Sequence, residues 1–153
     1  MVNIYAPNKT KDWCTFFEEI QKELDGSELD ENCDVIIGGD FNVILDADLD
    51  GMGGKSFIKE SFKKIEDLCS SFDLIDIYRI RNPGIRWFTW RQKNPIVQRR
   101  LDFWLINSTI QEEVENVDII PAIRNDHSTI SLHINGNEET GRGPLFANIT
   151  PAF

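Results

Sequence analysis

Three short stretches of the sequence carry side chains whose types and spacing suit chemistry on a charged substrate. The first is "GGDFNV" at residues 38–43, which follows the apolar run "DVII" and places Asp40 two residues before Asn42. A strand interior disfavours glycine and aspartate. The stretch therefore predicts a strand tip, where both side chains face the same way from an extended chain and approach a ligand. A solvated turn is the alternative, because Asp and Asn are common turn residues.

A histidine with a neighbouring carboxylate is the second candidate. In "NDHST", Asp126 and His127 directly precede the predicted strand "STISLHI". Such a histidine can act as a general acid or be held in its charged form. The chain has two histidines, and the other, His133, alternates with apolar residues inside the predicted strand. His127 is therefore the better candidate for chemistry, with an ordinary polar turn as the alternative.

The third candidate is Asp102, which stands within "RLDFWLIN", an otherwise apolar predicted strand. A buried carboxylate is unfavourable unless it is paired. One candidate partner is an arginine such as Arg100, in a structural ion pair. The other is a histidine side chain that the carboxylate would orient for catalysis.

The acidic stretch "DADLDG" at residues 46–51 matches the first half of a calcium-binding loop. The twelfth position of that loop would be Phe57 rather than a bidentate glutamate, and no flanking helix pair is predicted. The sequence therefore argues against an EF-hand.

Positive charge is concentrated in one segment of an acidic chain. The net charge is −10, yet residues 79–100 contain seven of the 16 basic residues and no acid. In "RWFTW" arginines lie beside aromatic residues, a pattern that suits stacking on nucleic-acid bases. Alternating aromatic residues are also typical of a buried strand. We expect this segment to form a positive rim beside the site.

Hydrophobic periodicity predicts the elements that must position these residues. The predicted helices cover about 10–25, 58–72 and, as a short helix, 108–114. The predicted strands cover 2–7, 34–40, 74–79, 86–90, 100–107, 116–122 and 128–134, with a loop over 44–56 and a polar linker or tail over 135–153. Helices that alternate with strands and precede a run of strands indicate an α/β sandwich, here one domain over residues 1–134.

Composition narrows the class of protein. The 153 residues are 41% hydrophobic, enough for a core, and the three cysteines form no CxxC pair. This cysteine usage argues against a disulfide framework and a zinc site. No signal peptide and no run of membrane-spanning length is visible, so we expect no membrane partner and an intracellular protein, nuclear or cytoplasmic.

Five motifs, taken in order, resemble those of the exonuclease–endonuclease–phosphatase superfamily: "NIYAPN", "GGDFN", "FTW", "RLDFWLIN" and "NDHS". Within it the chain is most similar to the endonucleases of non-LTR (LINE-type) retrotransposons, on "NIYAPN", "GGDFNVILDADLDG" and "GRGP". The resemblance runs from Asn3 to about Pro144. It implies a four-layer α-β-β-α sandwich and a DNA endonuclease that depends on Mg²⁺, with Mn²⁺ as an alternative ion.

The resemblance also implies roles for the matched residues. Asp40 would orient or activate the attacking water. Asn42, Tyr5 and Thr89 would contact the scissile phosphate. The physical chemistry agrees, because phosphodiester hydrolysis needs a positioned water and neutralisation of the phosphate charge.

The remaining roles concern the histidine and the DNA. By resemblance, His127 would stabilise the transition state or assist proton transfer, Asp102 would hold His127, and Asp126 would help hold the metal. The expected phosphate- and DNA-contacting residues further include Arg86, Trp90, Arg91, Lys93 and Asn125.

Departures from the family pattern concern both ends of the chain. Asn125 stands where this branch usually has Ser, a mild change. The family's metal-binding Glu lies in strands that precede the "NIYAPN" strand, and only Met1 and Val2 precede Asn3 here. The ending "LFANITPAF" lacks the aromatic sequence expected after the family's Gly-Pro. We therefore expect a partial sandwich that lacks the first strands of its first sheet.

The leading interpretation is the back portion of a Mg²⁺-dependent DNA endonuclease domain from a retrotransposon-type, reverse-transcriptase-containing polyprotein. Loss of the metal-binding Glu would impair it, so whether this chain is an enzyme stays open. The alternatives are a non-catalytic remnant and a repair endonuclease or phosphatase of the same superfamily. The basic, aromatic segment favours DNA over a small substrate, no small-molecule cofactor is expected, and the oligomeric state stays open.

Overall fold

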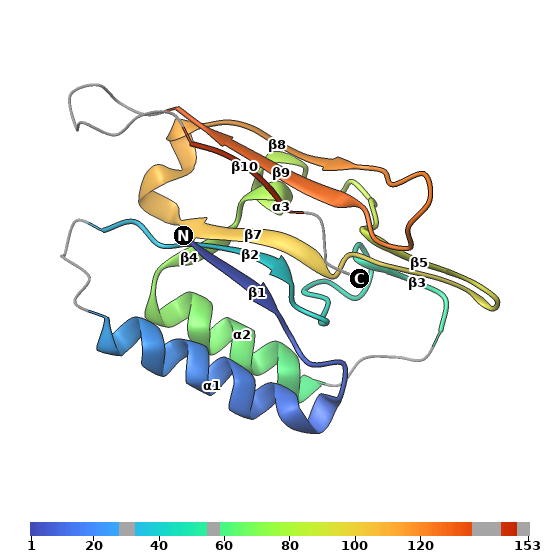
Figure 1. The fold of residues 1–153 in the computed structure, drawn as a ribbon, viewed down its shortest axis with the longest axis horizontal. Helices are drawn as coiled ribbons and strands as arrows, with labels where there is room; N and C mark the ends of the chain where they lie inside the picture. The colour runs from blue at the N-terminus through green and yellow to red at the C-terminus, as the bar shows by residue number, and fades with distance from the viewer. Residues whose placement is uncertain (28–32, 55–58, 136–144, 150–153) are drawn as a thin grey trace.

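The chain folds into stacked layers, shown in Figure 1. The structure is a computed structural model that describes residues 1–27, 33–54, 59–135 and 145–149. A four-stranded sheet has the order β1-β2-β7-β4, and a three-stranded sheet has the order β10-β9-β8. Helices α1 and α2 cover the face of the first sheet that is turned away from the second sheet. A small third sheet, β3-β6-β5, projects at one end.

The elements follow one another along the chain as three helices, one 3-10 helix and ten strands within the described residues. Their bounds are β1 (Val2–Tyr5), α1 (Thr10–Gly26), β2 (Ile36–Asp40), β3 (Gly51–Met52), α2 (Lys59–Ser71), β4 (Leu74–Asp76), α3 (Ile77–Arg81), β5 (Trp90–Lys93), β6 (Ile96–Arg99), β7 (Asp102–Asn107), η1 (Ser108–Glu113), β8 (Val114–Ile120), β9 (Thr129–Ile134) and β10 (Leu145–Ile149). The α/β sandwich predicted from the sequence is confirmed, and the described residues supply its helical layer and both sheets.

Strand β7 shows how one sheet serves two cores. Its side chains alternate, so Phe103 and Leu105 join the core beneath α1 and α2, whereas Trp104 and Ile106 join the core between the sheets. This is the period of two that a strand imposes on its side chains. A strand buried on both faces reads as a continuous apolar run, which is why "DFWLIN" has no polar alternation.

The two glycines of β2 are required by close packing. A Cβ on Gly38 would lie 2.2 Å from the Trp104 ring, and a Cβ on Gly39 would lie 2.0 Å from the backbone oxygen of Ile4. Gly39 also has a φ of 136°, which L side chains rarely adopt. The glycines therefore let the backbone of β1 and a core tryptophan approach β2 just before Asp40.

Several predicted strand boundaries are wrong. Residues 74–79 form β4 and then α3, because the side chain of Asp76 accepts a hydrogen bond from the backbone N–H of Arg79 and begins a helix. Of the predicted strand at 86–90, only Trp90 lies in a strand. The β5–β6 hairpin and β3 are not predicted.

The C-terminal segment is described only in part. Residues 145–149 form β10, which pairs antiparallel with β9, so this part of the predicted tail belongs to the second sheet. The "GRGP" motif and residue 58, the predicted start of the second helix, lie outside the described residues. The domain boundary at residue 134 stays a prediction. None of the helices in the described ranges has the length and hydrophobicity needed to cross a membrane.

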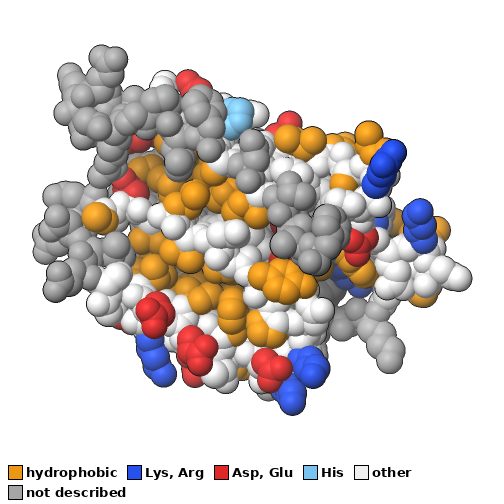
Figure 2. All heavy atoms as spheres, viewed as in Figure 1, with side chains coloured by type: hydrophobic (Ala, Val, Ile, Leu, Met, Phe, Trp, Pro, Cys, Tyr) orange, Lys and Arg blue, Asp and Glu red, His pale blue; other side chains and the backbone are white. Residues whose placement is uncertain are grey.

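Strand β1 lies at the edge of the first sheet beside an apolar groove. It pairs with β2 on one side, and the order β1-β2-β7-β4 places no strand from the described residues on the other. A groove of about 760 Å³ lies between β1 and α1, and Figure 2 shows hydrophobic side chains gathered on this face. Its apolar lining includes Val2, Ile4, Phe16, Ile20 and Leu24. An unpaired edge beside an apolar surface promotes association.

We predict that this chain, expressed by itself, self-associates through the β1 edge. Val2→Lys places a charge on the groove and should shift the protein toward monomer in light scattering after size exclusion, since lysine is a natural edge blocker. The matched control is Ile123→Lys, which adds the same charge away from the β1 edge, at a side chain that is 99% exposed. Equal monomer fractions in both variants would show that the edge is not the contact.

Candidate active site

The centre of the candidate site is a pair of carboxylates on adjacent strands. Asp40 ends β2 and Asp102 begins β7, and the antiparallel register places the two residues directly opposite each other. Their exposed fractions are 3% and 1%. Asp102 shares a strand face with Trp104, so both carboxylates project toward the second sheet.

His127 completes the site from the second sheet. It lies in the connection between β8 and β9, and its Nδ1 lies 3.0 Å from Oδ2 of Asp102. Its Nε2 lies 3.8 Å from Oδ2 of Asp40, close enough for an ion pair but too long for a hydrogen bond. The structure thus brings Asp40, Asp102 and His127 together, and the expected contact between Asp102 and His127 is confirmed.

The geometry perturbs the pKa values of two of these groups. Burial, and then the charge of Asp102, raise the pKa of Asp40 to about 6, against the lowering effects of the Asn42 backbone N–H and of His127. Burial lowers the pKa of His127, but the hydrogen bond and charge of Asp102, with the charges of Asp40 and Asp126, outweigh it and raise the pKa. Close to neutral pH the site therefore favours a carboxylate beside a charged imidazole.

The tip of β2 is held by a turn rather than by extended chain. Asn42 has a φ of 51°, so the expectation that it faces the same way as Asp40 along a strand is wrong. Instead its backbone N–H donates to Oδ1 of Asp40 at 2.8 Å. Its Nδ2 donates to the backbone oxygen of Ala6 at 2.6 Å and to Oδ1 of Asn8 at 3.0 Å. This Asx turn leaves Oδ2 of Asp40 directed at His127.

Both the side chain and the backbone of Thr89 take part in hydrogen bonds within the chain. Its side chain is fully buried, and its Oγ1 accepts hydrogen bonds from the backbone N–H groups of Leu101 and Asp102, at 2.9 and 3.0 Å. Its backbone oxygen accepts from the N–H of Ser128 at 2.6 Å. Thr89 thus connects the strand of Asp102, through its side chain, to the neighbour of His127, through its backbone oxygen. Its expected contact with the scissile phosphate stays a prediction.

The remaining predicted residues lie around the mouth of the site. Tyr5 ends β1 opposite Asp40 in the register, with 61% of its surface exposed. Trp90 bridges to His127 by strand pairing, and its Nε1 donates to Oδ2 of Asp126 at 3.2 Å. Asn125 and Asp126 are exposed in the same connection. Their expected roles toward phosphate and metal stay predictions.

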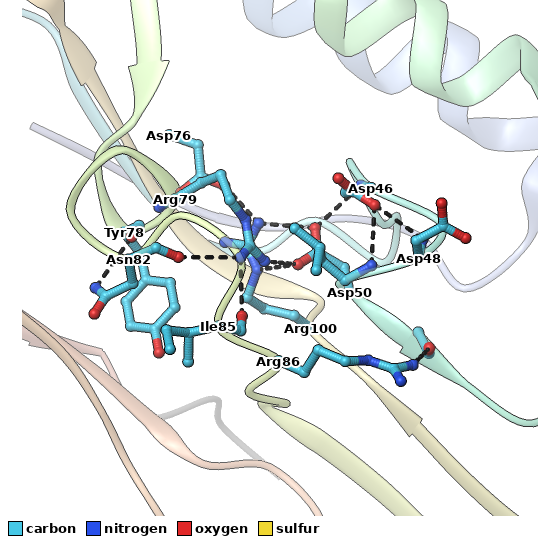
Figure 3. A network of polar contacts seen from close by, with 12 residues as sticks. Asp46, Asp48, Asp50, Asp76, Tyr78, Arg79, Asn82, Ile85, Arg86 and Arg100 are labelled. Atoms are coloured by element: carbon cyan, nitrogen blue, oxygen red, sulfur yellow. Dashed lines mark hydrogen bonds and ion pairs between the residues drawn. The ribbon is translucent and has the colours of Figure 1, made fainter.

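Part of the basic segment 79–100 is buried, so not all of its positive charge can contribute to the rim expected from the sequence. Arg100 is fully buried in ion pairs with Asp50 and Asp76, and Arg79 also pairs with Asp50 (Figure 3). Arg99 is buried, and its guanidinium donates to backbone oxygens of the β3–β6 ribbon. The chemical reason is that Arg79 and Arg100 neutralise acids of the chain itself, and Arg99 donates hydrogen bonds to its backbone carbonyls.

Other basic side chains of the segment are available at the surface. Arg86 is exposed and donates one bond to the backbone oxygen of Gly51. Arg91 and Lys93 line a groove of about 640 Å³ between the β5–β6 hairpin and the connection that carries His127. Arg124 lies on the opposite wall of this groove and was not singled out from the sequence, because it lies outside the basic block.

The donor atoms of the site fit a divalent cation. The ligand atoms of Asp40, Asp102 and His127 lie within 4.8 Å of one another. Oδ1 of Asp102 is buried and has no hydrogen-bond partner among the described residues, which is unfavourable for a carboxylate oxygen. Carboxylate oxygens are the ligands that Mg²⁺ prefers. Asp126, expected to hold the metal, is not a member of this cluster.

Comparisons with known proteins agree with this fold. The chain is 31% identical over 136 residues to the transposon TX1 uncharacterized 149 kDa protein of Xenopus laevis, which covers 88% of this chain. The structure of this chain matches the Xenopus laevis APE2 catalytic domain with a TM-score of 0.71 and 19% identity, over 94% of this chain and 50% of that one. The chain has the exonuclease–endonuclease–phosphatase fold.

Further solved structures share the exonuclease–endonuclease–phosphatase fold, with TM-scores and sequence identities in the same range. An AP endonuclease from Archaeoglobus fulgidus matches with a TM-score of 0.66 and 17% identity, over 88% of this chain and 61% of that one. The 3′ phosphatase NExo from Neisseria, bound to a product DNA hairpin, matches at 0.65 and 17%, over 88% and 60%. No family model matches the chain. The chain spans 10% of the transposon protein, and 50 to 61% of these three solved chains.

We predict that Asp102→Asn lowers the pKa of His127. The substitution removes the charge that raises this pKa and leaves the burial that lowers it. The titration of the two imidazoles can be followed by NMR, with His133 as the internal reference. Glu18→Gln, which removes one negative charge from α1, is the control and should leave His127 unchanged. An unshifted His127 in Asp102→Asn would refute the pairing.

Proposed function

We propose that this chain is part of a divalent-metal-dependent endonuclease domain that hydrolyses phosphodiester bonds in DNA. The observation that carries the proposal is the constellation of Asp40, Asp102 and His127 at one end of the two facing sheets. The similarity to a transposon protein supports an origin in a retrotransposon of the LINE type, where such a domain accompanies a reverse transcriptase. Its substrate would then be nuclear or cytoplasmic DNA.

Each residue of the constellation suits one part of the reaction. Asp40, with a pKa of about 6, is ionised near neutral pH and can accept a proton from an attacking water. His127, kept charged by Asp102, can donate hydrogen bonds to the phosphate or to the leaving oxygen as negative charge develops there. Because His127 Nε2 lies 3.8 Å from Asp40 Oδ2, too far for a hydrogen bond, its N–H can donate to a substrate while Nδ1 keeps its bond to Asp102.

A metal ion would be held by oxygen ligands of the same site. Asp40 and the unpaired Oδ1 of Asp102 are candidates, and the exposed Asp126 can add a ligand from the mouth. Bound Mg²⁺, or Mn²⁺ in its place, supplies neutralisation of phosphate charge and a lower pKa for water. Asp102 also orients His127, so this carboxylate would serve both the imidazole and the metal.

The surroundings of the site favour DNA over a small phosphoester. Arg91, Lys93 and Arg124 place positive charge in the groove that begins at Asp126, where the backbone of a nucleic acid would continue beyond a bound phosphate. Trp90 lies at the mouth, half-buried, where a base or sugar would pass. NExo is described as bound to a DNA hairpin, which supports the same class of substrate for this chain.

We expect Mg²⁺-dependent nicking of supercoiled plasmid, abolished by Asp40→Asn. The rate should rise as pH passes upward through about 6, where Asp40 loses its proton, and fall again above the raised pKa of His127, where the imidazolium is lost. The assay is run on this chain and on its Asp40→Asn variant. Nicking that persists in Asp40→Asn would contradict the proposal, and no nicking by the wild type would favour a non-catalytic remnant.

We also expect the groove to contribute to DNA affinity. Replacing Arg91 and Lys93 with glutamine should weaken binding. It should also make the slope of log affinity against log salt shallower, by the amount that corresponds to the loss of about two phosphate contacts. Lys64→Gln is the control, because this lysine pairs with Glu18 on the helical layer. A salt slope equal to that of the wild type would mean that the groove does not bind DNA backbone.

A further inference from the structure

Asp50, in the acidic loop that resembles half of a calcium site, is the centre of a buried ionic network. Its carboxylate accepts hydrogen bonds from Nε and Nη2 of Arg100, at 2.7 and 2.8 Å, and from Nη2 of Arg79 (Figure 3). Asp50 and Arg100 both have an exposed fraction of 0%. A bidentate pair of this kind fixes the orientation of both side chains as well as their distance. Asp50 therefore has the geometry of an anchor rather than of a metal ligand.

The same two residues are also joined through their backbones. The N–H of Arg100 donates to the backbone oxygen of Asp50 at 2.9 Å, and the N–H of Asp50 donates to that of Asp46 at 2.8 Å. Nη2 of Arg100 donates in addition to Asp76, the capping residue of α3. The Arg100 guanidinium lies 5.1 Å from the centre of the Phe103 ring. Arg100 is therefore held through both its backbone and its side chain.

The anchored residue stands immediately before the site. Leu101 follows Arg100, and its backbone oxygen accepts a bond of 2.8 Å from the N–H of Phe41, the neighbour of Asp40. Its N–H and that of Asp102 both donate to Thr89, whose backbone oxygen in turn accepts the N–H of Ser128. A displacement of residue 100 would therefore be transmitted to the backbones beside Asp40, Asp102 and His127.

We propose that Asp50 is a positioning residue of the active site: by holding Arg100 it fixes the start of β7, and with it the placement of Asp102 against the ring of His127. The inference rests on the proposed function only for its catalytic consequence. Asp50 acts at a distance: its carboxylate bonds to arginines and to the N–H of Asp46, and within the described part of the chain it makes no hydrogen bond or ion pair with the three site residues. If the network served stability alone, disrupting it would lower the unfolding midpoint and leave the site geometry intact.

The test reads the site directly, in protein free of DNA and metal. In wild type labelled with ¹⁵N-histidine, the Nδ1–H proton of His127 should give a resonance shifted downfield by its bond to Asp102, with His133 as the internal reference. We expect Asp50→Asn to abolish this resonance, or to speed its exchange with solvent by about tenfold or more. Asp102→Asn is the positive control.

The matched control variant is Asp46→Asn. Asp46 caps the same loop by accepting the N–H groups of Asp48 and Leu49, both at 2.9 Å, and its side chain does not bond to Arg100. It should lower stability and leave the His127 resonance as in wild type. Arg100→Lys provides a second disruption of the anchor, because lysine cannot reproduce the bidentate geometry.

The outcomes separate positioning from stability. Loss of the His127 signal in Asp50→Asn or Arg100→Lys, with retention in Asp46→Asn, supports the proposal. An unchanged signal in a folded Asp50→Asn overturns it, and failure of both anchor variants to fold assigns the network to stability alone. Where the enzyme nicks DNA, kcat of Asp50→Asn should fall by up to about a hundredfold with little change in KM, as a displacement on the order of 1 Å can cause. An inactive wild type with a displaced His127 in the variant would refute the function and leave the positioning role standing.

Discussion

Two carboxylates directly opposite each other on paired, buried strands are the constraint on which the site depends. Like charges in this arrangement repel, and burial removes the water that would screen them. Burial first, and then this repulsion, raises the pKa of Asp40. His127 relieves the strain by bonding to Asp102 and by lying 3.8 Å from Asp40. A pair that is unfavourable for stability thus becomes a proton acceptor held beside a cationic donor.

The rest of the structure keeps this unfavourable arrangement in place. The first sheet is buried on both faces, so the register of β2 against β7 cannot slip without exposing two cores. Glycines in β2 admit Trp104 and the backbone of β1 close to the pair. Thr89 ties the strand of Asp102 to the connection that carries His127. The ion pair of Arg100 holds the chain just upstream.

The sequence predicts the reactive residues of the site better than it predicts the contacts that hold them in place. Asp40, Asp102 and His127 could be found because each breaks a local pattern: a carboxylate at a strand tip, an acid within an apolar strand, and a lone polar histidine before a strand. The Asp50–Arg100 pair could not, since the two residues are 50 positions apart and nothing local marks them as partners.

Other errors have equally physical causes. Counting charges cannot tell an arginine that neutralises a buried acid from one that faces solvent. The sequence therefore overestimates how much of the positive charge of the basic segment lies at the surface. The strand predicted at "RWFTW" is wrong before Trp90: the aromatic residues there do not pack as one buried strand, since Trp87 is 41% exposed and the buried Thr89 lies in a bend. The Asx turn at Asn42 depends on the side chain of Asp40, which outweighs the extended preference of the preceding strand.

The most direct test of the central claim is a crystal structure of the protein with a short DNA duplex that carries a hydrolysis-resistant phosphorothioate linkage, grown with Mn²⁺. The account predicts one backbone phosphate within hydrogen-bonding distance of His127 Nε2, with an anomalous metal peak at an oxygen of Asp40. It also predicts that the adjacent phosphates follow the groove lined by Arg91 and Lys93. DNA bound elsewhere on the surface, with Asp40 and His127 contacting neither phosphate nor metal, would contradict it.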